Sequence, residues 1–189
     1  MKAVVAALLI VLAAPAANAT SLCEAPDDAL ADLLAGTWTG EPRQSIDSLD
    51  TARIRAPGEI RVRLAAGDPG LAMTTGFLDN LGIAPLDMRR ARPVPFDVDR
   101  VDDVLDTTEN AVLADLLSDT PCGPESLPQF SGTVDIEGGT RVEGTITIVA
   151  YFTDRLLGIT ELTLQNDGAT LYLTETVLLR PAEPAPGDG

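Results

Sequence analysis

Residues 130–180 read FSGTVDIEGGTRVEGTITIVAYFTDRLLGITELTLQNDGATLYLTETVLLR, and apolar and polar side chains alternate along most of them. This period of two predicts β-strands that bury one face. Turn residues interrupt the alternation at Gly138-Gly139-Thr140, Thr153-Asp154-Arg155 and Asp167-Gly168. Asp-Gly between two apolar runs is a strong signal for a tight hairpin turn. The stretch therefore predicts a four-stranded antiparallel meander.

A single register keeps one face of this meander apolar. It pairs Ile136 with Val142, Phe152 with Leu156, and Leu164 with Leu171. The predicted inner face consists of Phe130, Val134, Ile136, Val142, Ile146, Ile148, Ala150, Phe152, Leu156, Leu162, Leu164, Leu171, Leu173, Val177 and Leu179. A second apolar cluster, on the opposite face, consists of Val149, Tyr151, Leu157, Ile159 and Leu178. Because a monomer rarely exposes a large apolar patch, we expect helices or another protein to cover this cluster.

The rest of the chain predicts two helices and little other regular structure. Leucines recur at helical spacing in residues 26–34 and 107–117, whereas Ile60, Val62 and Leu64 alternate with arginines and predict a strand. Residues 41–50 resemble a loop, and residues 67–95 follow no clear pattern apart from a possible helical turn near Thr75 to Leu81. We expect an α+β, mostly β, single domain over residues 20–180. Its core would be an antiparallel meander sheet or partial β-barrel with two short helices packed on it, followed by a disordered acidic, proline-rich tail over residues 181–189.

The first 19 residues, MKAVVAALLIVLAAPAANA, have the organisation of a secretion signal. Lys2 provides the positive start, residues 3–14 are apolar, and Ala17-Asn18-Ala19 matches a small-x-small cleavage site. The apolar run is shorter than the about 20 residues that a membrane-spanning helix needs. We therefore expect cleavage after Ala19, export to the periplasm or the medium, and no membrane span.

The chain has two cysteines, Cys23 and Cys122, and we expect them to form a disulfide. An even number of cysteines in an exported protein favours a bridge. Closing a loop of about 100 residues stabilises a fold by up to about 4.7 kcal/mol in the chain-entropy account. Zinc binding is the alternative, but the chain has no histidine to complete such a site. Lipid attachment at Cys23 is disfavoured because Leu22, which is not a small residue, precedes it.

The charge of the chain excludes one class of partner. It has 29 acidic and 13 basic residues, for a net charge of −16. Removal of the signal takes away the only lysine, so the processed chain carries 12 arginines and a charge of 12 − 29, or −17. Such a field repels nucleic acid, and it keeps an exported protein soluble. We expect no nucleic-acid binding.

The residue types also argue against catalysis. With no histidine in the chain, the commonest general base and the usual metal ligand are both missing. A carboxylate-based hydrolase is the remaining enzymatic alternative, with Glu161 and Glu175 as its candidate pair. The predicted register places these two on opposite faces of the sheet, so they cannot converge on one substrate atom. The acidic residues between Asp97 and Asp103 lack the pattern of a calcium loop, and we expect a solvated turn there.

Gly36-Thr37-Trp38 follows a short helix and opens the first strand. This Gly-x-Trp element resembles the signature of lipocalins and related calycin barrels. Arg180 adds to the resemblance, because lipocalins pack an arginine from the last strand across that tryptophan as a cation–π contact. The resemblance implies an up-and-down barrel that holds a small apolar ligand. The calycin plan has eight strands, whereas this sequence predicts six or seven.

We expect a non-enzymatic binding module, without a cofactor, that holds a small apolar ligand in a sheet or barrel pocket. The candidate ligand-binding residues are Trp38, Phe130, Phe152 and Glu175. The alternative is a protein-interaction or structural role in the cell envelope, which would use the outer apolar face at Tyr151, Ile159 and Leu178. A cavity above about 300 Å³ would favour the first hypothesis, because ligand pockets begin near that size.

Overall fold

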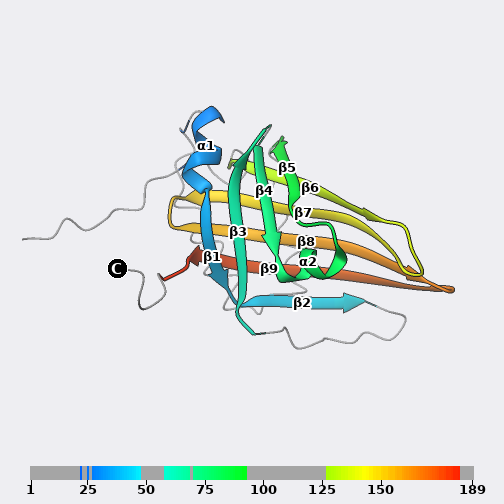
Figure 1. The fold of residues 1–189 in the computed structure, drawn as a ribbon. Coiled ribbons are helices and arrows are strands. Elements are labelled where there is room, and N and C mark those ends of the chain that lie inside the picture. Colours follow the sequence, from blue (N-terminus) through cyan, green and yellow to red (C-terminus); the bar gives the residue numbers. More distant parts are fainter. Residues whose placement is uncertain are drawn as a thin grey trace, which may run out of the picture.

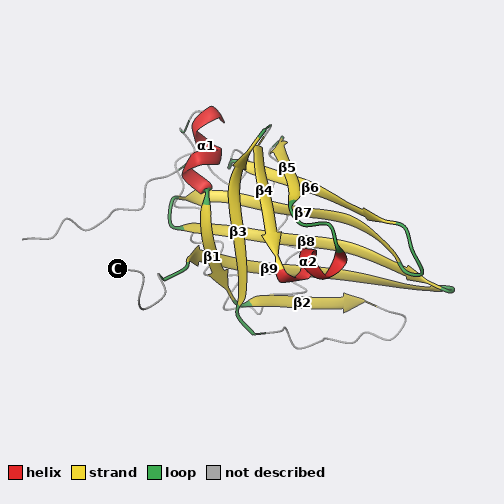
Figure 2. Cartoon of the chain, in the orientation of Figure 1, coloured by secondary structure: helices red, strands yellow, loops and turns green. Residues whose placement is uncertain are grey.

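The structure is a computed structural model that describes residues 22, 25, 27–47, 58–68, 70–92 and 127–183. Two helices and nine strands make up the regular structure of these residues (Figures 1 and 2). The helices are α1 (Asp27–Leu34) and α2 (Gly76–Leu81), and the strands are β1 (Gly36–Gly40), β2 (Pro42–Asp47), β3 (Ile60–Gly67), β4 (Gly70–Thr75), β5 (Leu86–Ala91), β6 (Gln129–Ile136), β7 (Arg141–Phe152), β8 (Arg155–Asn166) and β9 (Ala169–Pro181).

All the described strands belong to one antiparallel sheet, with the order β1-β3-β4-β5-β6-β7-β8-β9-β2. The first strand, β1, pairs with β3 along one edge, and along its other edge Trp38 and Thr39 pair with Pro181 and Arg180 of β9. The second pairing closes the sheet into an eight-stranded barrel. Beyond Glu41, β2 continues along β9 from Pro42 to Asp47. Consecutive strands from β3 to β9 are neighbours, so the topology is up-and-down, and the fold is a closed barrel instead of an open sheet.

Two of the three predicted hairpin registers are confirmed. Ile136 pairs with Val142, and Leu164 pairs with Leu171. The predicted pairing of Phe152 with Leu156 is wrong, because Phe152 pairs with Arg155 and Leu156 pairs with Ala150. The β7–β8 turn is thus two residues long, and an irregularity between Ala150 and Phe152 takes up the extra residue. Beyond this irregularity the whole ladder is shifted by two residues from the predicted register, as in Ile148 opposite Gly158. Because side chains alternate with a period of two, a shift of two residues leaves the inner and outer faces unchanged.

The predicted inner face of the meander points into the barrel. Its central members, such as Val134, Ile146, Ile148, Leu156 and Leu162, are buried in the hydrophobic core. Leu171 differs, since 38% of its surface is exposed. In Figure 1 the β6–β7 and β8–β9 hairpins extend beyond the ends of β3–β5, so none of these three strands lies opposite the hairpin tips.

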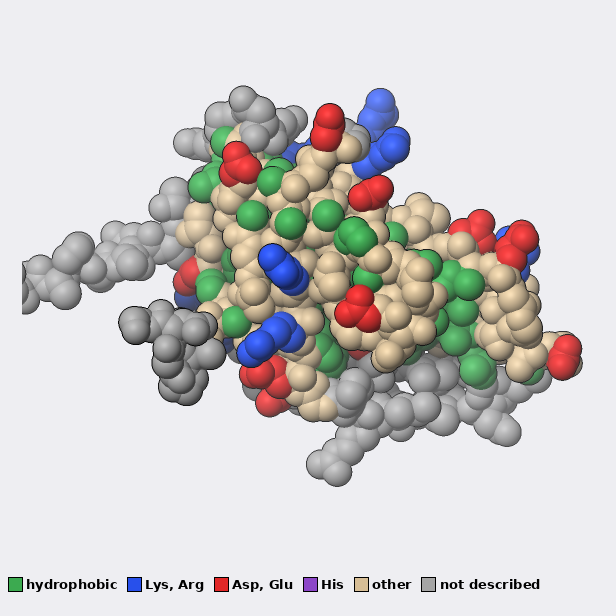
Figure 3. Space-filling model, viewed as in Figure 1, with side chains coloured by type: hydrophobic (Ala, Val, Ile, Leu, Met, Phe, Trp, Pro, Cys, Tyr) green, Lys and Arg blue, Asp and Glu red, His purple; other side chains and the backbone are tan. Residues whose placement is uncertain are grey.

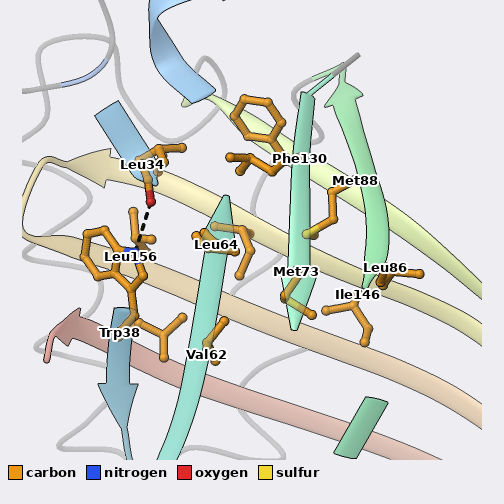
Figure 4. Close-up of a cluster of buried hydrophobic side chains, with 14 of the residues drawn as sticks. Leu34, Trp38, Val62, Leu64, Met73, Leu86, Met88, Phe130, Ile146 and Leu156 are labelled. Carbon is orange, nitrogen blue, oxygen red and sulfur yellow. Dashed lines mark hydrogen bonds between the residues drawn. The ribbon is translucent and has the colours of Figure 1, made fainter. Parts of the chain in front are cut away.

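One end of the barrel is filled by side chains from α1 and β1. Leu30 and Leu34 of α1 are fully buried, and Trp38 of β1 is 3% exposed. The indole Nε1 of Trp38 donates a hydrogen bond to the carbonyl oxygen of Leu34 at 3.1 Å (Figure 4). This bond satisfies one of the carbonyls that the end of a helix leaves without a partner. The predicted helix is confirmed, although Leu33, one of its three leucines, is 48% exposed.

The region between β3 and β6 contains more strand than the sequence predicts. Strands β4 and β5 lie inside residues 67–95, and together they supply the pairings that make the barrel complete. Strand β2 lies where a loop was expected. Its sequence, PRQSID, has no apolar alternation, and its strand partner among the described residues is β9. The expected helical turn near Thr75 to Leu81 is confirmed as α2.

Several predictions fall on residues outside the described ranges. These are the signal at residues 1–19, Cys23, Cys122, the acidic residues 97–103, the helix over residues 107–117, and the tail from residue 184 onward. The predicted start of that tail at residue 181 is wrong, because Pro181 belongs to β9 and the Ala182 N–H donates to the Thr37 carbonyl oxygen at 2.8 Å. The helices in the described part of the chain are all too short to cross a bilayer.

We predict that Trp38→Ala lowers the free energy of unfolding by about 3–5 kcal/mol, because the truncation leaves a cavity in a filled barrel end. The variant also removes the hydrogen bond to Leu34. Tyr172→Ala is the control, since Tyr172 is 57% exposed and its loss should cost no more than about 0.5 kcal/mol. Trp38 is the only tryptophan, so urea unfolding must be followed by circular dichroism. If the two variants lost equal amounts of unfolding free energy, Trp38 would not be filling the end of the barrel as we describe.

Candidate functional site

A cavity of about 540 Å³ occupies the barrel on the side of the core away from α1. It is lined by residues of β3, β4, α2, β7, β8 and β9. Its volume lies within the range of about 300–1,000 Å³ that is usual for small-molecule pockets. The barrel is therefore filled at one end and hollow towards the other.

The deeper wall of the cavity is apolar. Val62 and Met73 contribute from β3 and β4, and Ile148, Val177 and Leu179 contribute from β7 and β9. All five side chains are buried. Each points inward because its strand alternates between the barrel interior and the outer surface. An apolar molecule bound here would bury its surface away from water, and no polar group of this part of the wall would lose a hydrogen-bond partner.

A glycine helps to keep this part of the cavity open. Gly158 of β8 lies between Ile148 and Val177, which are its partners on the neighbouring strands. A Cβ atom at this position would approach the Cγ1 atom of Val177 to 2.8 Å. A larger residue would therefore displace Val177 or take up part of the cavity.

The mouth of the cavity lies beside α2. Phe77 and Asn80 of α2 and Arg61 of β3 line the cavity and are also exposed, so they mark where it meets solvent. Phe77 and Asn80 are three residues apart and share one face of the helix. Phe77 is 43% exposed, which places an aromatic ring at the entrance.

Helix α2 is short, and its ends are capped. The Thr75 hydroxyl oxygen accepts a hydrogen bond from the Leu78 N–H at 3.2 Å. At the other end, Gly82 has a φ of 72°, a left-handed conformation that glycine adopts without a steric penalty, and its N–H donates to the Asp79 carbonyl. Leu78 anchors the helix to the core. The caps hold Phe77 and Asn80 at the mouth.

Two polar residues interrupt the apolar wall between its deeper part and its outer part. Thr160 of β8 and Glu175 of β9 are direct cross-strand partners, and both line the cavity. They lie one inward-facing position farther from the α1 end of the barrel than Gly158 and Val177 (Figure 1). Both are half-buried. A carboxylate in this wall is costly unless it is hydrogen-bonded, and Glu175 does interact within the fold.

The four residues proposed from the sequence to bind a ligand are not brought together. Only Glu175 lines the cavity. Trp38 and Phe130 are buried in the filled end (Figure 4), and the half-buried Phe152 lies near the β7–β8 turn with the Arg155 guanidinium 5.8 Å from its ring centre. Sequence reasoning assigned inward positions correctly, but it could not place them along the barrel axis. The signal that could have located the cavity wall is the register, which places Glu175 opposite Thr160 and Thr160 opposite Ile146 on the inner face.

The arginine contact implied by the lipocalin resemblance is not present. Arg180 is exposed and pairs with Thr39, on the side of the sheet opposite to Trp38. In the described part of the chain, guanidinium groups instead lie over Phe130, from Arg90 at 5.6 Å, and over Phe152. The expected packing of Arg180 across Trp38 is therefore wrong, because the register at the end of β9 turns the arginine outward.

The outer apolar cluster is largely covered. Val149 and Leu157 are buried although they face away from the barrel interior, and Ile159 and Leu178 are half-buried. The side chain of Tyr151 lies outside the described set. The face therefore does not present an open apolar patch at these four positions.

The carboxylates of the described residues do not gather into a metal site, and the two that were considered as a hydrolytic pair lie on opposite faces. Glu161 pairs with Thr174 and faces outward, whereas Glu175 faces the cavity, as the predicted register requires. No group of three or more carboxylate or cysteine ligands comes together among the described residues. Acidic and arginine side chains are scattered over the face in Figure 3 and do not gather into a patch of one sign.

Comparisons with known proteins found no matching protein-family model, no similar curated protein and no similar solved structure. The closed eight-stranded antiparallel barrel is compatible with a lipocalin-like fold. The candidate site therefore rests on the geometry of the barrel cavity.

We predict that Thr75→Ala destabilises α2 by about 1 kcal/mol, because it removes the N-cap oxygen. The amide of Leu78 should then exchange with solvent about fivefold faster, which hydrogen-exchange mass spectrometry or NMR can measure. Thr74→Ala is the matched control, since Thr74 lies on the other face of β4 and does not cap the helix. An unchanged exchange rate in Thr75→Ala would contradict the cap.

Proposed function

We propose that this protein binds a small, mainly apolar molecule inside the barrel. The cavity of about 540 Å³ is the observation that carries the proposal. A barrel whose only role was structural would gain stability by filling this space, because voids in a core cost contacts. A wall that is apolar at depth and open beside α2 is instead suited to a ligand that enters from solvent.

The chemistry of the wall supports the apolar character of the ligand. Burial of apolar surface contributes about 25 cal/mol per Å², so a ligand that removes about 200 Å² of its own surface from water gains about 5 kcal/mol. Losses of motional freedom reduce this gain. A gain of about 5 kcal/mol corresponds to a dissociation constant of about 0.2 mM at best, so we expect weak binding for a ligand that buries this area and tighter binding for one that buries more. Such binding does not require a catalytic group.

We also propose binding instead of turnover. The two carboxylates that could have formed a hydrolytic pair face opposite sides of the sheet. The chain offers no histidine to act as a base. A carrier needs neither, because it requires only a shaped cavity and a route into it.

Export is part of the proposal and has its own test. Signal cleavage after Ala19 would leave Thr20 as the first residue, and an oxidising compartment would join Cys23 to Cys122. We predict that the intact mass of protein recovered from cells corresponds to a chain that begins at Thr20 and lacks two thiol hydrogens. A chain that retains residue 1, or that carries two alkylatable thiols without reduction, would contradict this part of the proposal.

The main test of the proposal fills the cavity. We predict that Leu173→Trp weakens binding of the neutral fluorescent probe N-phenylnaphthylamine about tenfold or more. Leu173 lines the cavity, and the larger tryptophan ring would occupy space that the probe needs. Thr174→Trp is the matched control, since Thr174 is the next residue on β9 and faces outward. Probe fluorescence titration measures both, and circular dichroism confirms that both variants are folded.

Three outcomes of that experiment are distinguishable. Loss of probe binding in Leu173→Trp alone supports the cavity as the site. Equal loss in both variants would place the probe on the outer surface. Absence of probe binding to the unmodified protein, together with native mass spectra that show no bound small molecule, would remove the proposed function.

A further inference from the structure

We propose that the ligand is an amphiphile with a cationic amine, whose head group meets Glu175 and whose apolar part fills the deeper wall. This inference rests on the proposed function, because it assigns a ligand class to the same cavity. Its basis is the position of one carboxylate within a wall that is otherwise mainly apolar.

The cavity wall is ordered in rows that follow the strand register. The deeper row contains Ile148, Gly158 and Val177, and it has no polar side chain. The next row towards the mouth contains Ile146, Thr160 and Glu175. A molecule that enters beside α2 with its apolar end first would therefore bring its other end to the row of Thr160 and Glu175.

The polar groups of this row favour a ligand head group that is positively charged and donates hydrogen bonds. The Glu175 carboxylate is an acceptor with about four lone-pair sites, so it can bind a ligand proton in addition to its interaction within the fold. Thr160, directly opposite on β8, adds a hydroxyl that can accept a second proton. Ammonium carries three donors, and hydrogen bonds between charged partners are about twice as strong as neutral ones.

An anionic ligand fits this wall poorly. Its head group would lie beside the carboxylate of Glu175 in a partly desolvated site, where like charges repel strongly. Arg61 is the one basic residue among the described residues that line the cavity, and it is exposed on the outer side of β3. Its exposure places it where the cavity meets solvent.

The charge of the whole chain acts in the same direction. A net charge of −16 raises the local concentration of cations around the protein and lowers that of anions. This long-range effect is screened by salt, whereas a contact with a half-buried carboxylate is screened much less. The two contributions can therefore be separated by ionic strength.

The experiment compares three ligands that share one alkyl chain: decylamine, decanol and decanoate. Each competes with N-phenylnaphthylamine for the unmodified protein at neutral pH, below its micellar concentration. We expect decylamine to bind about tenfold more tightly than decanol, and decanoate to bind most weakly. Raising the salt concentration should leave most of the preference of amine over alcohol intact.

Two variants locate the source of the preference. Glu175→Gln removes the charge and keeps the shape of the side chain, and it should bring decylamine to within about twofold of decanol. Glu161→Gln is the matched control, because it changes the net charge equally at an outward-facing position of β8. It should leave the preference for amine over alcohol unchanged. Thr160→Val should weaken amine binding by a smaller factor, since it removes a neutral acceptor.

The results separate this inference from the proposed function. If decanol and decanoate bind as tightly as decylamine, or if Glu175→Gln retains the preference, the head-group assignment is wrong while the cavity remains a ligand site. An equal effect of Glu161→Gln would assign the preference to the overall charge and overturn the contact with Glu175. If none of the three ligands displaces the probe and the probe itself does not bind, the proposed function and this inference fail together. The ligand comparison on the unmodified protein does not depend on whether any variant folds.

Discussion

The structure depends on the pairing of one short strand, β1, with two partners. Its contact with β3 continues the meander, and its contact with β9 closes the barrel. Closure removes the open sheet edges that would otherwise present unpaired backbone groups to solvent or to other chains. It also creates an interior. The pattern of inward and outward side chains decides which residues face that interior, but an interior that can hold a ligand exists only because the two ends of the sheet meet.

The two ends of this interior have different roles. At the α1 end, buried leucines and Trp38 fill the space, and the Trp38–Leu34 hydrogen bond ties the helix to the first strand. Towards α2 the wall is lined by apolar side chains that do not meet across the centre. The filled end supplies the packing that stabilises the fold, which allows the other end to remain hollow at a cost in contacts. The proposed ligand would occupy the hollow end and leave the packing of the filled end unchanged.

The polar row formed by Thr160 and Glu175 is the feature of the interior that apolar packing does not explain. A carboxylate in a barrel wall costs free energy relative to an apolar residue, even when it is hydrogen-bonded. Its neighbours along β9, Leu173 and Val177, are apolar and also line the cavity. Local rules of packing are most often broken at functional sites. For the proposed binding role, the carboxylate therefore says more about the ligand class than the larger number of apolar residues around it.

The sequence by itself determined the strands of residues 130–180 and two of their three hairpin registers, because alternation of side chains and Asp-Gly turn chemistry are local properties. It did not determine the β7–β8 register, which an irregularity between Ala150 and Phe152 sets. It also determined α1, the helical turn that became α2, and the opposite orientation of Glu161 and Glu175. Only the tertiary structure decided that β2, β4 and β5 are strands, that the sheet closes, and that Arg180 faces away from Trp38. Likewise, only the tertiary structure separated Trp38 and Phe130 in the filled end from Glu175 in the cavity wall. The physical reason is the same in each case: these outcomes depend on pairing and packing between residues far apart in the chain, which local periodicity does not encode.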